Sequence, residues 1–158
     1  MTKNIFRNCA IAALVLAASQ AVASAQNPQS IQGVWLVNVT VTNCQTGALI
    51  RTVKSVQIFN PDGSVSETSS LGNRGSSIGV WTPGDGPTFG ARYWFFRYTP
   101  TETFASIAAI VDLITISADG SQFTSSGTVQ DFDASGDLLD TGCFVHAAKR
   151  LASLGPAF

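Results

Sequence analysis

Apolar and polar residues alternate along most of the chain from residue 33 onward, which is the pattern of β-strands that bury one face. The alternation is clearest in residues 33–42, where four apolar side chains share a face: Trp35, Val37, Val39 and Val41. Further runs rich in Val, Ile, Thr, Phe and Tyr follow this one. The pattern predicts eight strands, at residues 33–42, 51–60, 64–71, 77–82, 89–99, 104–117, 121–132 and 137–150.

Short turn sequences separate these runs. Clusters of Asn, Asp, Gly and Pro, which favour tight turns, occupy residues 60–63, 82–87, 118–120 and 133–136. The nearest candidate for a helix, residues 104–113, continues into a β-branched run and is assigned to a strand. Eight antiparallel strands with short connections predict an all-β, up-and-down barrel, because closure leaves no exposed edge. A two-sheet sandwich is the alternative.

The first 25 residues have the features of a secretory signal peptide. Lys3 and Arg7 precede an apolar stretch of about ten residues, and Ala23-Ser24-Ala25 provides a small-x-small cleavage site. The apolar stretch is too short to cross a bilayer as a helix, although an uncleaved N-terminal anchor is the alternative. We therefore expect a secreted or periplasmic protein with a leader at 1–25, one barrel domain at 26–158 and no membrane span in the mature chain.

Two of the three cysteines, Cys44 and Cys143, remain after the leader, and an oxidising compartment favours a disulfide between them. In a closed barrel the first and last strands pair, so this disulfide would join them. If Cys44 lies opposite Cys143, then Val41 faces His146 and Val37 faces Arg150. The face that carries Trp35 is then the interior, provided that no bulge inverts it.

Composition narrows the classes of partner. Nine basic and ten acidic residues give a formal charge of −1, and 12% of all residues are charged. A nucleic-acid-binding protein would need a basic stripe, so that class is not expected. The sparse charge also argues against a charged ligand held by salt bridges. Sequence motifs for a P-loop, a Rossmann fold or a G-x-S-x-G nucleophile are absent, and we expect no metal and no cofactor.

Gly33-Val34-Trp35 in the first strand and Arg150 in the last resemble the closing motif of the calycins, the group that includes lipocalins and avidins. The resemblance implies that Trp35 packs under Arg150 at a closed end of the barrel, beside Gly33. Eight strands, an export signal and no helix bring the chain closer to the avidin-like layout. By resemblance, the protein binds a small apolar or amphipathic molecule inside the barrel.

Residues 92–98 are the candidate lining of such a site, because seven large side chains follow one another. One face of this strand carries Arg92, Trp94, Phe96 and Tyr98; the other carries Tyr93, Phe95 and Arg97. One set lines or fills the barrel and the other lies outside. The first set, together with His146, is the candidate ligand-binding group. An apolar set on the outer face would suit a homo-oligomer.

His146 is the only histidine, and as an interior residue it could act as a general base or orient a ligand. A partly exposed strand histidine is the alternative. Asp112 interrupts the apolar run 110–114 and therefore needs water or a partner, for which Arg92 or Arg97 of the neighbouring strand is expected. No residue is assigned as catalytic.

Two other functions stay open. Allene-oxide-cyclase-like barrels suggest a cofactor-independent cyclase or isomerase, and a filled barrel would be a structural or interaction module. The volume of the interior discriminates among them, because ligand pockets usually exceed about 300 Å³. A carboxylate or His146 at the cavity would favour the enzyme, and an apolar lining would favour the binding protein.

Overall fold

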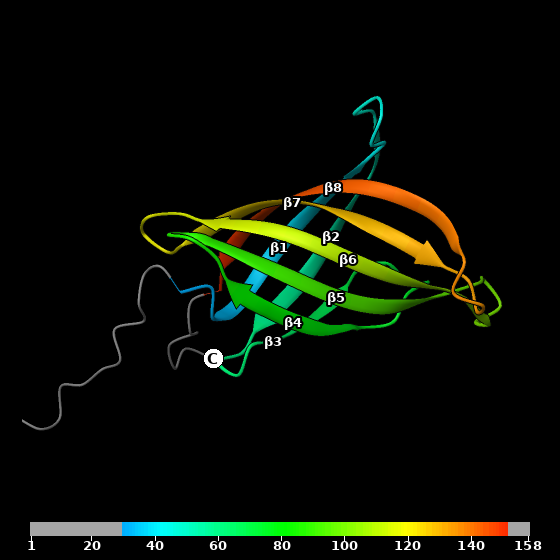
Figure 1. The fold of residues 1–158 in the computed structure, drawn as a ribbon, viewed down its shortest axis with the longest axis horizontal. Coiled ribbons are helices and arrows are strands. Elements are labelled where there is room, and N and C mark those ends of the chain that lie inside the picture. The colour runs from blue at the N-terminus through cyan, green and yellow to red at the C-terminus, as the bar shows by residue number, and fades with distance from the viewer. Residues whose placement is uncertain (1–29, 152–158) are drawn as a thin grey trace, which may run out of the picture.

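A computed structural model describes residues 30–151, and they form one closed antiparallel barrel (Figure 1). Neighbours in sequence are neighbours in the sheet, and the last strand pairs with the first. This confirms the predicted fold class and excludes the two-sheet sandwich. The strands are β1 (Gly33–Thr42), β2 (Leu49–Phe59), β3 (Ser64–Ser69), β4 (Ser77–Pro83), β5 (Thr88–Tyr98), β6 (Phe104–Ile116), β7 (Gln122–Phe132) and β8 (Leu138–Arg150).

The predicted leader, residues 1–25, lies outside the described residues. Within residues 30–151 there is no helix of the length and apolarity needed to cross a bilayer. Each predicted strand lies within about two residues of an observed one. The largest differences are at β2, which starts two residues earlier, and at β3, which ends two residues earlier.

The pairing of β1 with β8 differs from the expected register by two residues. Trp35 pairs with Arg150, Val39 with His146 and Val41 with Phe144. Cys44 lies beyond the end of β1, and Cys143 pairs with Thr42. The disulfide Cys44–Cys143 is present, but it therefore joins the loop after β1 to β8 across a diagonal. Side chains repeat every two residues along a strand, so the predicted interior face is still correct.

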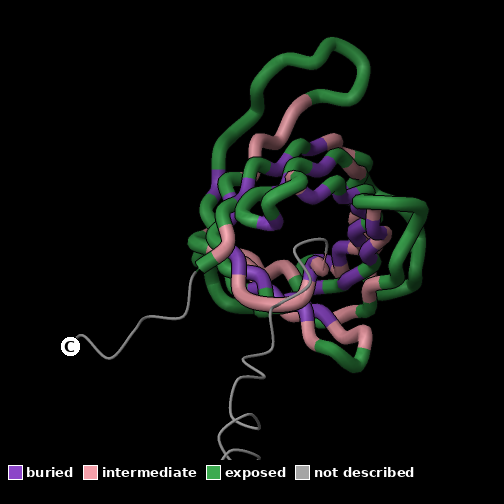
Figure 2. Tube along the Cα trace, turned by 90° about the vertical axis from the view of Figure 1, so that its left-hand side faces the viewer, coloured by how far each residue is buried: buried purple, intermediate pink, exposed green. Residues whose placement is uncertain are grey.

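The core is most apolar at one end of the barrel, which we call the closed end. Aromatic and aliphatic side chains fill it, and Trp35 meets Phe123 edge to face at 4.9 Å between ring centroids. Figure 2 shows buried and exposed positions alternating along the strands. The large residues of this layer are Ile31, Trp35, Phe59, Phe89, Ile114, Ile116 and Phe123.

Arg150 covers this layer. Its guanidinium carbon lies 4.2 Å from the centroid of the Trp35 ring. The same group donates hydrogen bonds to the carbonyl oxygens of Gly120 (2.7 Å), Ser30 (2.5 Å) and Gln32. Gly33 has a φ of +126°, and a Cβ there would lie 2.8 Å from Arg150 Nη1. Only glycine therefore fits beside the guanidinium, and the contact expected from the Gly-x-Trp pattern is present.

Candidate functional site

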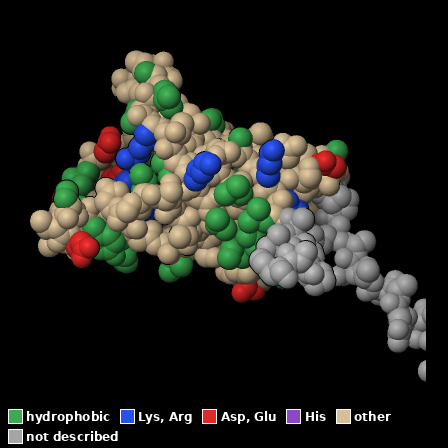
Figure 3. Space-filling model, turned by 180° about the vertical axis from the view of Figure 1, so that it is seen from behind, with side chains coloured by type: hydrophobic (Ala, Val, Ile, Leu, Met, Phe, Trp, Pro, Cys, Tyr) green, Lys and Arg blue, Asp and Glu red, His purple; other side chains and the backbone are tan. Residues whose placement is uncertain are grey.

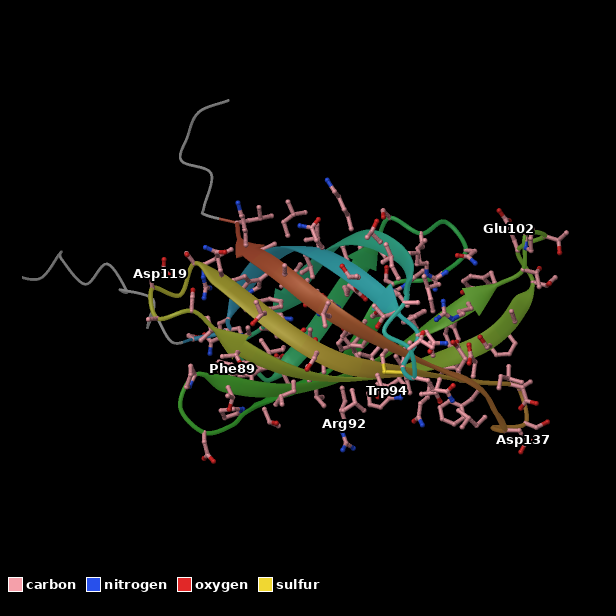
Figure 4. All side chains as sticks on the ribbon, turned by 90° about the horizontal axis from the view of Figure 1, so that it is seen from above. Phe89, Arg92, Trp94, Glu102, Asp119 and Asp137 are labelled. Atoms are coloured by element: carbon pink, nitrogen blue, oxygen red, sulfur yellow. A yellow bond between two sulfur atoms is a disulfide. The ribbon has the colours of Figure 1, made fainter. Side chains whose placement is uncertain are left out.

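The direction of the side chains in β5 corrects one prediction. Tyr93 and Phe95 are buried inside the barrel, whereas Arg92, Trp94 and Phe96 are exposed on its outer wall. Arg92 projects away from the barrel in Figure 4. The latter three therefore do not line the interior. The inner face of β5 continues from Phe89 and Ala91, which pack into the closed end, and pairing with β6 is regular up to Arg97.

Tyr98 also belongs to the outward set, and it is half-buried at the end of β5. Its ring lies against the loop between β3 and β4, 3.7 Å from the position of a Cβ on Gly75. Of the five predicted ligand-binding residues, only His146 lines the interior cavity. The predicted set is therefore not brought together in one place.

The interior cavity lies toward the end opposite Arg150, which we call the open end, and has a volume of about 50 Å³. That volume is far below the roughly 300 Å³ of ordinary ligand pockets and holds about three or four water-sized spheres. Most of the barrel is thus filled by side chains, and on the volume criterion the interior favours a filled barrel over one that encloses a whole ligand. The cavity is lined by apolar Val39, Val41, Val53, Leu71, Phe95, Ile110, Val129 and Phe144, and by polar Arg51, Glu67, Arg74, Tyr93, Arg97 and His146.

Arg74 is one reason that the cavity is small. It belongs to the loop between β3 and β4, and its guanidinium carbon lies 3.4 Å from the centroid of the Phe95 ring. Its Nη2 is 2.5 Å from the buried carboxylate of Glu67, which also accepts a 2.7 Å hydrogen bond from Ser77. A loop arginine thus enters the barrel, where a carboxylate and an aromatic ring hold it.

Two further arginines surround the open end. Arg97 forms a 2.5 Å ion pair with Asp131, and its guanidinium carbon lies 4.9 Å from the centroid of the Phe95 ring. Arg51 is exposed, and within residues 30–151 it forms no ion pair. Three of the seven basic side chains in this range therefore line one cavity. The low content of charged residues argues against a charged ligand, but that content does not show which charged side chains the fold brings together.

Asp112 and His146 form a buried pair beside the cavity. Asp112 Oδ2 lies 3.1 Å from His146 Nδ1, and the two side chains are 0% and 2% exposed. Among residues 30–151, neither oxygen of Asp112 has a partner aligned for a hydrogen bond. The expected pairing of Asp112 with an arginine is wrong, because Arg92 lies outside and Arg97 binds Asp131.

Ser125 completes this cluster without making a nucleophile relay. Its Oγ lies 2.8 Å from His146 Nδ1, the same nitrogen that faces Asp112. In a Ser-His-Asp triad the serine and the aspartate bind opposite nitrogens of the ring. The arrangement therefore cannot activate Ser125 in that way. His146 lines the cavity and Asp112 does not, so the histidine separates the carboxylate from the cavity.

Tyr93 supplies a neutral donor to the same space. Burial raises the pKa of its hydroxyl well above the usual value of 10.0, and the negative charges of Asp112 and Glu67 raise it further. Gln57 Nε2 donates to the hydroxyl oxygen at 3.4 Å. Gly79 of β4 lies opposite, where a Cβ would be only 2.4 Å from Tyr93 Cα. Tyr93 therefore keeps its proton and can donate it in a hydrogen bond.

Three of these residues were not predicted as site residues from the sequence: Arg51, Glu67 and Arg74. Tyr93 and Arg97 belong to the face of β5 that was not chosen as the ligand-binding set. A signal existed for Glu67, which lies two residues after Val65 and so shares its inward face. An inward carboxylate requires a cation nearby. Arg74 gave no such signal, because its position in the loop sets no side-chain direction. No group of three His, Cys, Asp or Glu side chains in residues 30–151 is placed to hold a metal ion.

Together these features define a small closed β-barrel with an apolar closed end and three arginines at the other. Comparison of the chain with models of known protein families, with curated proteins and with solved structures found no match. Its function is therefore inferred from the fold and the cavity.

Proposed function

We propose that the protein binds a small amphipathic molecule with an anionic head at the open end of the barrel. The observation that carries this proposal is the placement of three arginines around a cavity whose other walls are mainly apolar. Arg74 and Arg97 are already paired with carboxylates, which leaves Arg51 to receive the anion. A charge-assisted hydrogen bond to Arg51 would position the head, and the apolar end would enter the cavity.

The size of the cavity limits the apolar part of the ligand. Each buried methylene contributes about 0.8 kcal/mol, but only a few carbon atoms fit into about 50 Å³. Affinity is therefore expected to rise with chain length over the first few carbons and then to level off. A barrel that simply stores long lipids would instead show affinity that continues to rise.

Ligand-observed NMR tests the proposal with straight-chain carboxylates of two to ten carbons and with the matched primary amines. We expect saturation transfer to the carboxylates, a plateau after a few carbons and no transfer to the amines. Arg51→Gln should weaken binding by about tenfold, as expected for one lost charge-assisted contact. Lys54→Gln is the matched control, because Lys54 is exposed on the outer face of the same strand. Equal binding of amines and carboxylates would contradict the anionic head, and saturation transfer to neither series would contradict the proposal and favour a filled structural barrel.

A second candidate function is proton transfer without a cofactor, and the placement of His146 between Asp112 and the cavity favours it. In this reaction His146 removes a proton from a carbon beside a carbonyl group, and the C–H electron pair moves into the resulting enolate. Tyr93, which keeps its proton, donates a hydrogen bond to the enolate oxygen. The carbon then regains a proton from His146 or water.

Pyruvate in D₂O is a suitable probe for this second function, because it offers both a carboxylate and an exchangeable methyl group. Loss of the methyl proton signal above the buffer rate supports proton transfer, and His146→Gln should abolish that excess while carboxylate binding persists. Binding without exchange in the unaltered protein would leave only the binding function.

We also propose that the protein is exported and that its barrel is calycin-like. The signal-like residues 1–25 and the disulfide Cys44–Cys143 support export. The stacking of Arg150 on Trp35 beside Gly33 supports the likeness to calycins. Mass spectrometry of the protein isolated from its natural source tests export, because cleavage after Ala25 would give a chain that begins at Gln26.

A further inference from the structure

We infer that the outer wall of β4, β5 and β6 is the contact surface of a symmetric dimer of this chain. Six exposed apolar side chains form this surface, which we call the outer apolar face. They are Ile78, Val80, Trp94, Phe96, Val111 and Leu113, with exposed fractions of 70%, 54%, 41%, 50%, 47% and 62%. This inference does not depend on the proposed ligand.

The six residues form one continuous patch. Ile78 pairs with Trp94 across β4 and β5, and Arg92 lies between Val80 and Val111. Arg92 is the single charged side chain within the patch. Strand alternation places all of these side chains on the outer wall, opposite the buried Tyr93 and Phe95. A sheet face of this kind, apolar and three strands wide, would ordinarily be covered.

The area of the outer apolar face is close to the area that each protein buries in a stable dimer. The exposed fractions correspond to roughly 600 Å² of surface, at the upper limit for patches on monomers and near the roughly 800 Å² that each partner contributes to a stable dimer. A second apolar cluster on β1 and β2 is less exposed. Its residues Leu36, Val56 and Ile58 are 36–39% exposed.

In the view from behind, uncharged polar side chains and backbone make up most of the surface (Figure 3).

The positions of a large side chain and a groove on the outer apolar face favour a second copy of the same chain as the partner. Trp94 carries the largest side chain of the outer apolar face, and a groove of about 430 Å³ lies beside Gly90 on the same strand, between β4 and β6. Gly90 and Trp94 lie at equal distances on either side of Arg92. Consider a two-fold axis that runs between the two packed walls, at right angles to β5 and level with Arg92. Rotation about this axis places Trp94 of each copy opposite Gly90 of the other.

The axis also brings the two Arg92 side chains close to each other, so each guanidinium must turn along its own strand toward the groove that it lines. A tryptophan from the partner that enters the groove would meet the Arg92 side chain, and a guanidinium over an indole ring is a favourable contact. Trp94, the groove beside Gly90 and Arg92 are all on β5, so a symmetric interface would contain each contact twice. None of the six residues of the outer apolar face lines the interior cavity.

Analytical ultracentrifugation of the purified protein tests the inference directly. We expect a species of twice the chain mass at micromolar concentrations. Gly90→Leu fills the groove and should raise the dissociation constant at least tenfold. A Cβ at Gly90 meets only Thr82 Oγ1 at 3.6 Å, an ordinary contact, so the barrel should tolerate this change. Leucine adds apolar surface, so non-specific association would increase rather than decrease.

A double variant makes the test specific. Gly90→Leu combined with Trp94→Ala puts the large side chain at position 90 and the small one at position 94. The leucine of each copy then lies opposite the alanine of the other, so the two surfaces again fit together. We expect association to recover at least partly, whereas Trp94→Ala alone should weaken it. Val145→Glu on the opposite wall is the control and should leave the dissociation constant unchanged.

Three results would overturn the inference. They are a monomer at all concentrations up to about 1 mM, an unchanged dimer in Gly90→Leu, or equal dissociation by Val145→Glu. Binding of a monomer to phosphatidylcholine vesicles through Trp94 would also overturn it and would assign the face to a lipid surface.

Discussion

Removal of the Arg150 guanidinium should open the closed end of the barrel and lower the free energy of unfolding. Arg150→Ala deletes three hydrogen bonds to the carbonyl oxygens of Gly120, Ser30 and Gln32 and the stacking on Trp35. Each hydrogen bond to a charged group contributes about 1.5–3 kcal/mol, and the cation–π contact about 0.5–2 kcal/mol. Arg150 is only partly buried, so water can replace part of what is lost.

Desolvation also offsets part of the gain, and it lowers the pKa of the Arg150 guanidinium. We therefore expect a net loss of about 2–4 kcal/mol, or roughly 6–15 °C in Tm for a domain of this size. Urea unfolding followed by tryptophan fluorescence measures the change, with linear extrapolation to water. Arg150→Lys keeps the charge but cannot reach three carbonyls at once, so it should lose about half as much.

The size of the effect decides whether this reasoning is correct. A loss below about 0.5 kcal/mol in Arg150→Ala, as for an ordinary surface substitution, would refute it. Gly33→Ala provides an independent check, because its Cβ would lie 2.8 Å from Arg150 Nη1 at a φ of +126°. We expect that substitution to lower stability by about 1–3 kcal/mol. An unaffected Gly33→Ala variant would mean that neither the φ of Gly33 nor the position of the guanidinium beside it holds in solution.

Three further predictions concern the disulfide and two titratable groups. Replacing Cys44 and Cys143 by serine should lower the free energy of unfolding by roughly 4–5 kcal/mol, because the bond closes a loop of 99 residues; an unchanged urea midpoint would contradict this. The pKa of Asp119 is lowered to about 2 because the hydroxyls of Ser117 and Ser121 bind its carboxylate. Its stabilising contribution is therefore full above pH 3.8 and is lost as the pH falls toward 2, and Ser117→Ala should raise this pKa in a ¹³C NMR titration. Tyr93 should not ionise before the barrel unfolds at alkaline pH, because its folded pKa lies above 10.0 and stability falls only as the unfolded chain ionises. Tyr93→Phe should therefore leave the phenolate absorbance of the folded protein unchanged.

The fold could be predicted from the sequence because local rules agree along the chain. Strand alternation, as in Trp35 and Val37, and turn clusters, as in residues 60–63, define eight hairpin-connected strands. Pairing of Cys44 with Cys143 then predicts that the first and last strands meet. The predicted register differs from the observed one by two residues because the disulfide is diagonal: Cys143 pairs with Thr42, and Cys44 lies beyond the end of β1.

The candidate site could be predicted only in part, since its residues depend on side-chain direction and on one loop. In β5 both faces carry large aromatic residues, so hydrophobicity cannot distinguish Tyr93 from Trp94. Every second residue along β5 after Phe89 shares the inward face of Phe89, and this rule would have given the correct face. The entry of Arg74 into the barrel follows from tertiary contacts with Glu67 and Phe95, which no local pattern contains.

The two ends of the barrel have opposite chemistry, and this leads to a last prediction. Arg150 at the closed end covers apolar and aromatic side chains, whereas Arg51 at the open end lies beside a cavity among charged groups. Arg150→Ala should therefore reduce stability with little effect on carboxylate binding, and Arg51→Gln should do the reverse. The two residues share no partner, so their effects on unfolding in the double variant should add within about 0.5 kcal/mol. Thermodynamic coupling above that value would mean that the ends do not act independently, and it would extend the binding site through the filled interior.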